Sequence, residues 1–296
     1  IRFGLAGKTW GFQYSPYAYF NEHATFLDAV HEPMHINAQT FTNLLDLTTM
    51  LPHYFVGSNA DLPIVGGSML AHEHYQGGRH DFAMAKAHIQ KAITIPGFDN
   101  VDAGLVHWPM SVIRLTSSDR TTLAQAAEHV RATWANYSDE AVSIKAHAVD
   151  GTPHHTVTPI ARRVGDDYQL DLVLRDNQTS AQYPDGIFHP HQDVQHIKKE
   201  NIGLIEVMGL AILPARLLTE LAEVQKYLLD EPNDIADMHK AWADELKATQ
   251  TWTADTAQAQ LRQAVGKVFA RVLEDAGVFK QNDIGLAAFD RFVAAL

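Results

Sequence analysis

Two histidines separated by one residue lie in the glycine-bracketed segment GGSMLAHEHYQGG, residues 66–78. If this segment is extended, alternate side chains share a face, so His72, His74 and Gln76 point to the same side. An imidazole on that side can attack a phosphorus atom, and an amide N–H can stabilise the oxyanion that forms. Glycine lets the backbone of the Gly66–Ser68 turn approach an anion closely, and exposed N–H groups there can bind it. The pattern therefore favours phosphoryl transfer.

The same spacing has two other interpretations, and the residues alone leave them open. The second imidazole could hold a metal, which would make the motif a metal clasp. Both histidines could also be exposed in a glycine-rich turn and have no function, because short motifs produce false positives. A second H-x-H, His189-Pro190-His191, reduces the weight of this last interpretation.

The composition excludes several classes of protein. The chain has 296 residues, a net charge of −12 and no cysteine. The charge argues against binding nucleic acid through its phosphates, and the lack of cysteine excludes disulfides and thiolate metal sites within the chain. No apolar run approaches the ~18 residues of a transmembrane helix, so we expect no membrane partner. These features fit a cytoplasmic protein.

The hydrophobic patterns predict an α+β fold. Helical spacing and capping residues predict helices within 37–55 and 117–138. Residues 62–70 are predicted to form a strand, a glycine turn and a strand, and residues 154–177 a hairpin that turns at Gly165-Asp166. Strands, a helix, a strand and an H-x-H occur in this order twice, which predicts two related halves.

We therefore divide the chain into a first half at 1–100, a second half at 101–213 and a mainly helical region at 214–296. Because residue 1 is Ile and not Met, we expect the chain to be a portion of a longer or processed product.

Three segments resemble a known family. DLPIVGGSMLAHEHYQGG, Asp61–Gly78, is similar to the signature of the second class of galactose-1-phosphate uridylyltransferases, which belong to the histidine-triad superfamily. Residues Tyr14–His23 and His189–Leu217 resemble other segments of that family. The resemblance spans roughly residues 10 to 220. It implies two tandem histidine-triad-like halves with antiparallel sheets and packed helices.

The resemblance also implies a reaction. UDP-glucose and galactose-1-phosphate would be the substrates, and UMP would move between them through a covalent uridylyl-histidine. On this motif the nucleophile falls on His74, and Gln76 falls where a glutamine contacts the phosphoryl oxygens. The positions that match substrate contacts are Asn59, Gly66, Gly67 and Ser68 for the nucleotide phosphates, and Lys198, Lys199 and Glu206 for the hexose phosphate.

The family further implies metal sites and a homodimer. His31 and His72 match zinc ligands, but the cysteine pair that would complete the site is absent, so we expect any zinc to be weakly bound. His189 and His191 fall near a second metal site of the family, although packed or solvated histidines explain them equally well. Part of the nucleotide-binding lobe should lie upstream of residue 1, so we expect this chain alone to be poorly active.

Two other functions remain open at this point. A related histidine-triad hydrolase or nucleoside-diphosphate-sugar phosphorylase would use the same nucleophile with another acceptor. Gln76 argues weakly for the transferase, because histidine-triad hydrolases commonly have another histidine there. A non-catalytic metal-binding fragment is the third hypothesis, and it predicts bound metal without covalent nucleotide.

Overall fold

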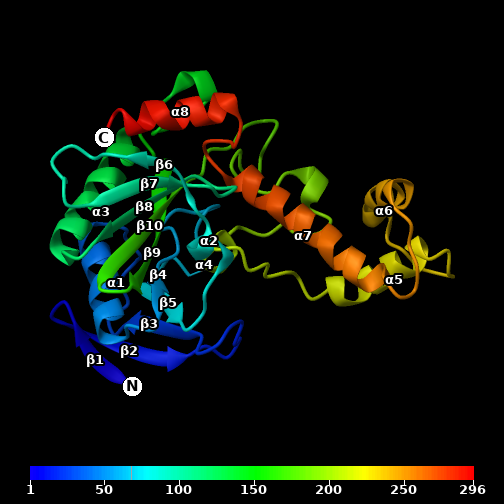
Figure 1. Ribbon diagram of the computed structural model, residues 1–296, viewed down its shortest axis with the longest axis horizontal. Helices are drawn as coiled ribbons and strands as arrows, with labels where there is room; N and C mark the ends of the chain where they lie inside the picture. Colours follow the sequence, from blue (N-terminus) through cyan, green and yellow to red (C-terminus); the bar gives the residue numbers. More distant parts are fainter. Residues whose placement is uncertain (68) are drawn as a thin grey trace.

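The computed structural model describes residues 1–67 and 69–296. This part of the chain forms a ten-stranded antiparallel sheet and eight α-helices, which confirms the predicted α+β class (Figure 1). The strands are β1 Arg2–Leu5, β2 Lys8–Tyr14, β3 Ala24–Asp28, β4 Phe55–Gly57, β5 His74–Gly78, β6 Ile89–Ile93, β7 Asp102–Val106, β8 Val112–Ser117, β9 His155–Val164 and β10 Asp167–Asp176. The helices are α1 Ala38–Met50, α2 Ala83–Lys86, α3 Arg120–Asn136, α4 Leu204–Val207, α5 Leu217–Leu228, α6 Asp237–Thr249, α7 Ala257–Ala276 and α8 Asp283–Val293.

The sheet has the same strand order on both sides of its centre. Across it the order is β1-β2-β3-β5-β4-β9-β10-β8-β7-β6. Each side consists of three strands, a helix and two further strands, with α1 after β3 and α3 after β8. The central strands β4 and β9 pair antiparallel at Val56–Ala161 and Gly57–Ile160. One continuous sheet therefore joins the first and second parts of the chain.

Local capping determines where α1 and α3 begin. Asn37 accepts hydrogen bonds from amides of the first turn of α1, and the Thr40 hydroxyl accepts one from the Asn37 N–H, which completes a capping box. Asp119 accepts from the first-turn amides of α3. Both helices pack against the same face of the sheet. The buried residues that form this core include Phe41, Leu44, Leu45, Leu123, Ala127, Trp134, Leu170, Leu172 and Leu174.

The opposite face of the sheet is covered by segments from later in the chain. α4 and the C-terminal part of α7 lie there, and their apolar residues form a second core with the strands. Its members include Phe55, Ile160, Val173, Leu204, Met208, Phe269 and Val272. This second core places α4 beside β4, which is the neighbour of β5.

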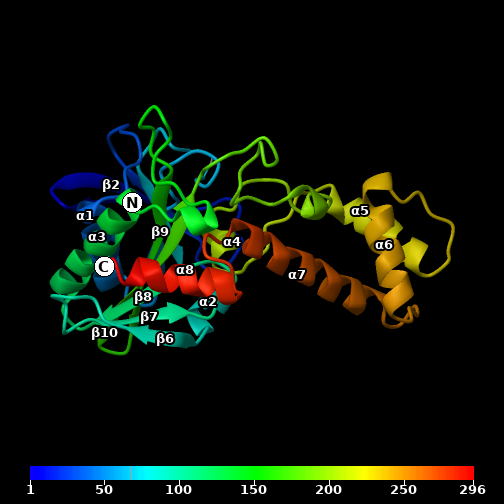
Figure 2. The same ribbon diagram turned by 90° about the horizontal axis from the view of Figure 1, so that it is seen from above.

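α5, α6 and the N-terminal part of α7 project from the sheet as an arm (Figures 1 and 2). The arm has a small core of its own, built around Val224, Leu228, Ala243 and Leu261. α8 returns to the body, where Phe292 packs edge-on against Trp134. None of the helices in the described chain is both long and apolar enough to cross a membrane.

The structure differs from the sequence prediction in two places. The described residues of 62–70 form turns, with a single parallel bridge between Ala60 and Gly66, so the strands predicted there are wrong. Val65 is buried although it is not part of a strand. Its hydrophobic pattern therefore reflects burial in a turn, which the sequence alone did not distinguish from a strand. The second H-x-H also does not end a strand, because β10 stops at Asp176 and a short 3₁₀ helix follows His191. The domain boundaries at 100 and 213 stay predictions.

Candidate functional site

β5 directs alternate side chains to opposite faces, as the sequence predicted for His74, Tyr75 and Gln76. Tyr75 turns toward α1, where its hydroxyl accepts a hydrogen bond of 3.0 Å from the Asn43 amide and its ring stacks on Trp10. His74 and Gln76 therefore turn to the other face of the sheet, the side on which α4 lies. His72 precedes the strand, so its orientation is not set by the strand alternation.

The hydrogen bonds of His74 define which nitrogen is available for chemistry. Its Nδ1 lies 2.8 Å from the His72 carbonyl oxygen. A carbonyl can only accept, so Nδ1 carries the proton and Nε2 has a free lone pair in the neutral ring. The side chain is 5% exposed, and this burial lowers the pKa of His74 below its ordinary value. Burial therefore favours the neutral ring near pH 7.

Gln76 has a partner that the sequence analysis missed. Its Oε1 lies 3.0 Å from Nε2 of His23, which is buried beside it. The two residues are 53 positions apart, and they meet because β3 pairs with β5 at Thr25–Gln76. His23 belongs to the segment Tyr14–His23 that resembles the family, which was the available signal.

Asn59 and the glycine turn lie together next to Gln76. Gln76 pairs with Gly57 on β4, and a Cβ at Gly57 would lie 2.8 Å from a methyl of Leu204 in α4. Asn59 is buried and its Oδ1 accepts a 2.8 Å hydrogen bond from Leu204 N. A Cβ on Gly67 would lie 2.7 Å from the Asn59 Nδ2, so any larger residue would displace the Asn59 side chain.

Gly66 is equally restricted, because a Cβ there would meet the carbonyl oxygens of Ala60 and Leu62. Ser68, the last residue of the predicted turn, lies outside the described residues. The structure therefore brings Asn59, Gly66 and Gly67 together near the end of β4, the neighbour of β5, and their contact with nucleotide phosphates stays a prediction.

Lys198 and Glu206 bind each other. Lys198 Nζ lies 3.0 Å from Glu206 Oε1 and donates to the Ile212 carbonyl, and both side chains are largely buried. Glu206 also accepts a hydrogen bond from the Gly203 amide, at the start of α4. As described, this ion pair holds the loop around α4 and does not present a free cation to a substrate.

Lys199 is exposed and lines a surface cavity of about 460 Å³ together with Ile64 and His189. Ile64 has a φ of +73°, a conformation that is strained for a β-branched residue. The Nε2 of His189 lies 3.2 Å from the Asn201 side-chain oxygen, and burial lowers the pKa of this histidine. The cavity lies between the loop that carries the glycine turn and the loop that precedes α4.

His31 and His72, the predicted zinc pair, stack on each other with ring centroids 3.8 Å apart and planes inclined by 25°. Histidine lone pairs lie in the ring plane, so two nearly parallel rings do not aim at one ion. His72 Nε2 also lies 2.7 Å from the Asp28 carbonyl oxygen, to which it can only donate. Within the described residues, no group of three or more His, Asp or Glu side chains is placed to hold a metal.

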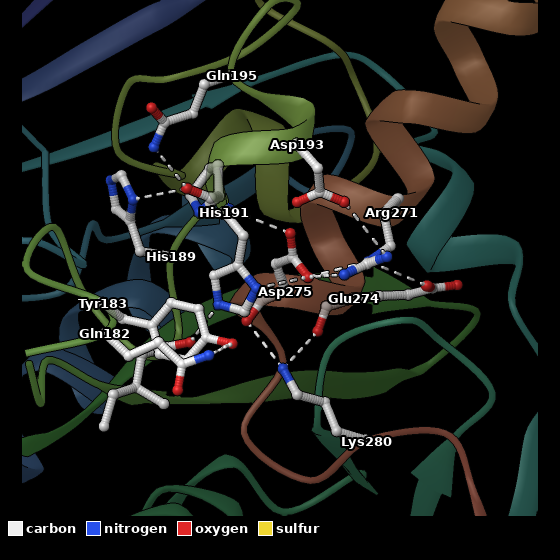
Figure 3. A network of polar contacts seen from close by, with 12 residues as sticks. Gln182, Tyr183, His189, His191, Asp193, Gln195, Arg271, Glu274, Asp275 and Lys280 are labelled. Carbon is white, nitrogen blue, oxygen red and sulfur yellow. Dashed lines mark hydrogen bonds and ion pairs between the residues drawn. The ribbon is translucent and has the colours of Figure 1, made fainter. Parts of the chain in front are cut away.

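His191 is part of a polar network that attaches its loop to the end of α7 (Figure 3). Its Nδ1 lies 3.3 Å from the Asp275 carboxylate, and its ring stacks on Tyr183. Arg271 binds the same carboxylate through its Nε at 3.0 Å. His191 Nε2 lies 2.9 Å from a backbone carbonyl oxygen. Both nitrogens of His191 therefore contact protein groups, which favours a packing role over metal binding.

Comparison with known proteins agrees with the family that the sequence resembles. Residues 48–244 match the family model for the C-terminal domain of galactose-1-phosphate uridyl transferase. Over its whole length the chain is 72% identical to the galactose-1-phosphate uridylyltransferase of Lacticaseibacillus paracasei and 70% identical to that of Lactiplantibacillus plantarum. It spans 61% and 60% of the length of those two proteins.

A solved structure of a DUF4931 family protein from Bacillus cereus matches 60% of this chain and 85% of its own, with 10% identity and a TM-score of 0.37, too low to support an argument. The family match does not depend on it, because the matched residues 48–244 are more than half of the chain. The chain therefore belongs to the galactose-1-phosphate uridyl transferase family.

Proposed function

We propose that this chain carries the uridylyl-transfer site of a UDP-glucose–hexose-1-phosphate uridylyltransferase, with His74 as the covalent nucleophile. The observation that carries the proposal is the 2.8 Å contact between His74 Nδ1 and the His72 carbonyl oxygen. It selects the neutral tautomer whose Nε2 lone pair can attack phosphorus. The relatives from L. paracasei and L. plantarum are named galactose-1-phosphate uridylyltransferases, which supports the same reaction.

The reaction has two displacements at one phosphorus. His74 Nε2 attacks the α-phosphorus of UDP-glucose, an N–P bond forms, and the bond to the bridging oxygen breaks with glucose-1-phosphate as the leaving group. The imidazole becomes positively charged, and the His72 carbonyl stabilises that charge through Nδ1–H. A phosphate oxygen of galactose-1-phosphate then attacks the same phosphorus, the N–P bond breaks, and UDP-galactose leaves neutral His74 behind. Gln76 donates its amide hydrogens to the phosphoryl oxygens.

The substrate contacts follow from the same geometry. The nucleotide phosphates would lie against Gly66 and Gly67, whose lack of side chains allows a close approach. Lys199 is the exposed cation in the neighbouring cavity, which suits the hexose phosphate. Lys198 and Glu206 would support this loop as a pair and would not contact the sugar directly.

We infer that the two sides of the sheet are histidine-triad-like halves, because they share strand order and helix position. The homodimer rests on the family resemblance and the cytoplasmic location on the lack of cysteine, and both stay predictions. A weak, incomplete zinc site also stays a prediction. To bind zinc, at least one ring of the stacked His31–His72 pair would have to turn, and further ligands would have to join the two histidines.

The test is the intact mass of the chain after incubation with UDP-glucose. The expected result is a gain of one uridylyl group, which galactose-1-phosphate removes as UDP-galactose. His74→Gly should abolish the gain while circular dichroism shows an unchanged fold, and His53→Gly, at an exposed histidine in the loop between α1 and β4, should keep it. A label that decays in water alone would favour the hydrolase. Labelling of His74→Gly at the normal rate would overturn the assignment of the nucleophile.

A further inference from the structure

We propose that His23 is a positioning residue that fixes the orientation of the Gln76 amide. Its Nε2–H holds the carbonyl oxygen of Gln76, so that both amide hydrogens of Gln76 are directed toward the phosphoryl group that His74 attacks. The inference rests on the proposed function, and it assigns a role to a residue outside the H-x-H-x-Q motif. The contact that carries it is the 3.0 Å distance between His23 Nε2 and Gln76 Oε1.

The position of His23 is determined by the strand that carries the nucleophile. His23 is 4% exposed, and its ring packs against Phe20 with centroids 4.4 Å apart. Phe20 in turn lies directly over Gly78 at the end of β5, because a Cβ on Gly78 would lie 2.6 Å from its ring. The residue before His23, Glu22, has a φ of +55°, a strained value for a non-glycine residue. The segment thus keeps an unfavourable backbone conformation while it places this ring beside Gln76.

The proton position on His23 follows from burial. Nδ1 of His23 is buried and has no hydrogen-bond partner within the described residues. A proton on Nδ1 would leave a buried N–H donor without an acceptor, which native proteins rarely tolerate. The neutral tautomer with the proton on Nε2 leaves only an acceptor unpaired and allows Nε2–H to donate to Gln76 Oε1. The Gln76 oxygen then faces His23, and its NH₂ group is free.

The orientation matters because the reaction develops negative charge on the phosphoryl oxygens. An NH₂ group that faces them stabilises that charge, whereas a carbonyl oxygen in its place would repel it. Without His23 the Gln76 amide can rotate between both orientations. We expect the loss of this constraint to slow uridylylation by ~10- to 10²-fold. This loss of rate should not exceed the loss that follows removal of the oxyanion donor itself. Ground-state binding of UDP-glucose should change little, because most of its contacts lie elsewhere.

The alternative is that His23 is only a packed core histidine. Three variants separate the two roles. His23→Leu puts an apolar side chain of moderate size in place of the ring and removes the donor. His23→Gln has an amide N–H that reaches about as far as histidine Nε2, so it restores the donor. Gln76→Ala removes the group that His23 is proposed to position.

The experiment measures the single-turnover rate of uridylylation, the Kd for UDP-glucose and the melting temperature of each variant. We expect a lower rate in His23→Leu, recovery to within a few-fold of wild type in His23→Gln, and a His23→Leu/Gln76→Ala double variant no slower than Gln76→Ala alone. Such non-additivity is the signature of one residue acting through the other. A wild-type rate in His23→Leu, additive losses in the double variant, or no recovery in His23→Gln would overturn the proposal.

Nitrogen NMR of the substrate-free chain gives a readout that does not depend on activity. The proton of His23 should lie on Nε2, and Gln76→Ala should shift that nitrogen signal. A proton on Nδ1, or a signal that ignores Gln76→Ala, would overturn the positioning role even if wild-type labelling succeeds. If the wild-type chain acquires no uridylyl group while the NMR result is as expected, the proposed function fails and the His23–Gln76 contact stands. If His23→Leu does not fold, His23→Gln and Gln76→Ala still decide.

Discussion

Asn59→Ala should detach α4 from the glycine turn. The Asn59 side-chain oxygen, Oδ1, accepts a 2.8 Å hydrogen bond from Leu204 N, and Leu204 is 1% exposed. Alanine leaves this buried amide without an acceptor, and an unsatisfied buried donor costs ~1–3 kcal/mol. We therefore expect the free energy of opening around α4 to fall by ~2 kcal/mol. Since ~1.4 kcal/mol is a factor of ten, this is a ~30-fold change in an equilibrium constant.

The assay is hydrogen exchange at Val207, whose amide donates to the Gly203 carbonyl inside α4. Exchange through opening should become ~30-fold faster in Asn59→Ala, because exchange rates follow the opening equilibrium. The matched variant Asn59→Asp keeps the acceptor oxygen for Leu204, so its exchange should stay closer to wild type. It also places a negative charge where the nucleotide phosphates are proposed to lie, so it should weaken UDP-glucose binding more than it weakens the fold.

Asn136→Ala is the control, because Asn136 is exposed at the end of α3 and its side-chain amide donates to a carbonyl one turn earlier in the same helix. Surface changes of this kind usually stay within ~0.5 kcal/mol. If Asn59→Ala leaves Val207 exchange as slow as Asn136→Ala does, the hydrogen bond to Leu204 is not what holds α4 in place, and the reasoning is wrong.

Two further predictions concern stability. Gly266→Ala adds a Cβ inside α7 that meets no atom within 4 Å, so it should raise the free energy of unfolding by ~0.5–1 kcal/mol. Gly66→Ala adds a Cβ that meets two backbone carbonyls, so it should lower the free energy of unfolding. Urea unfolding of both variants measures these changes, and a gain in stability at Gly66 would contradict the tight turn. Burial lowers the pKa values of His23 and His196 in the folded chain. As the pH falls, the unfolded chain therefore takes up protons at these two histidines first, so their contribution to stability should be constant above about pH 6.5 and decrease below it. A double variant with Gln at both positions should show a shallower decrease of the urea midpoint as the pH falls.

The elements that the sequence predicted well are those whose signals are local. α1 and α3 begin beside Asn37 and Asp119, which cap them as expected. The β9–β10 hairpin turns at Gly165, which has the positive φ that such a turn requires. In each case a few neighbouring residues specify the backbone, so the prediction needs no knowledge of the rest of the chain.

The features that the sequence did not predict depend on contacts between distant residues. The His23–Gln76 pair forms only because β3 lies beside β5 in the sheet. The stacking of His31 on His72 depends in the same way on how two loops approach each other. The sequence shows which histidines are near each other along the chain. It does not show whether their ring nitrogens point toward one common site.

The two sides of the sheet share a strand order but differ in what their outer face can do. β10 occupies the place that β5 has on the other side. On β10 the face turned toward α4 and α7 carries Val173 in the second core, and Asp171, whose carboxylate is fully buried between two arginines. That face of β10 is therefore covered by the second core, and the charge of the Asp171 carboxylate is paired.

On β5 the same face carries His74 and Gln76, and it is packed less completely. α4 reaches it only at its edge, where Leu204 meets Gly57 and Asn59. The covering helices come from the last third of the chain, and they therefore serve both sides at once: they close the face of β10 and hold the wall of the site beside β5. This division fits the single H-x-H-x-Q motif of the sequence. Under the proposed function, loosening α4 should slow uridylyl transfer without touching His74.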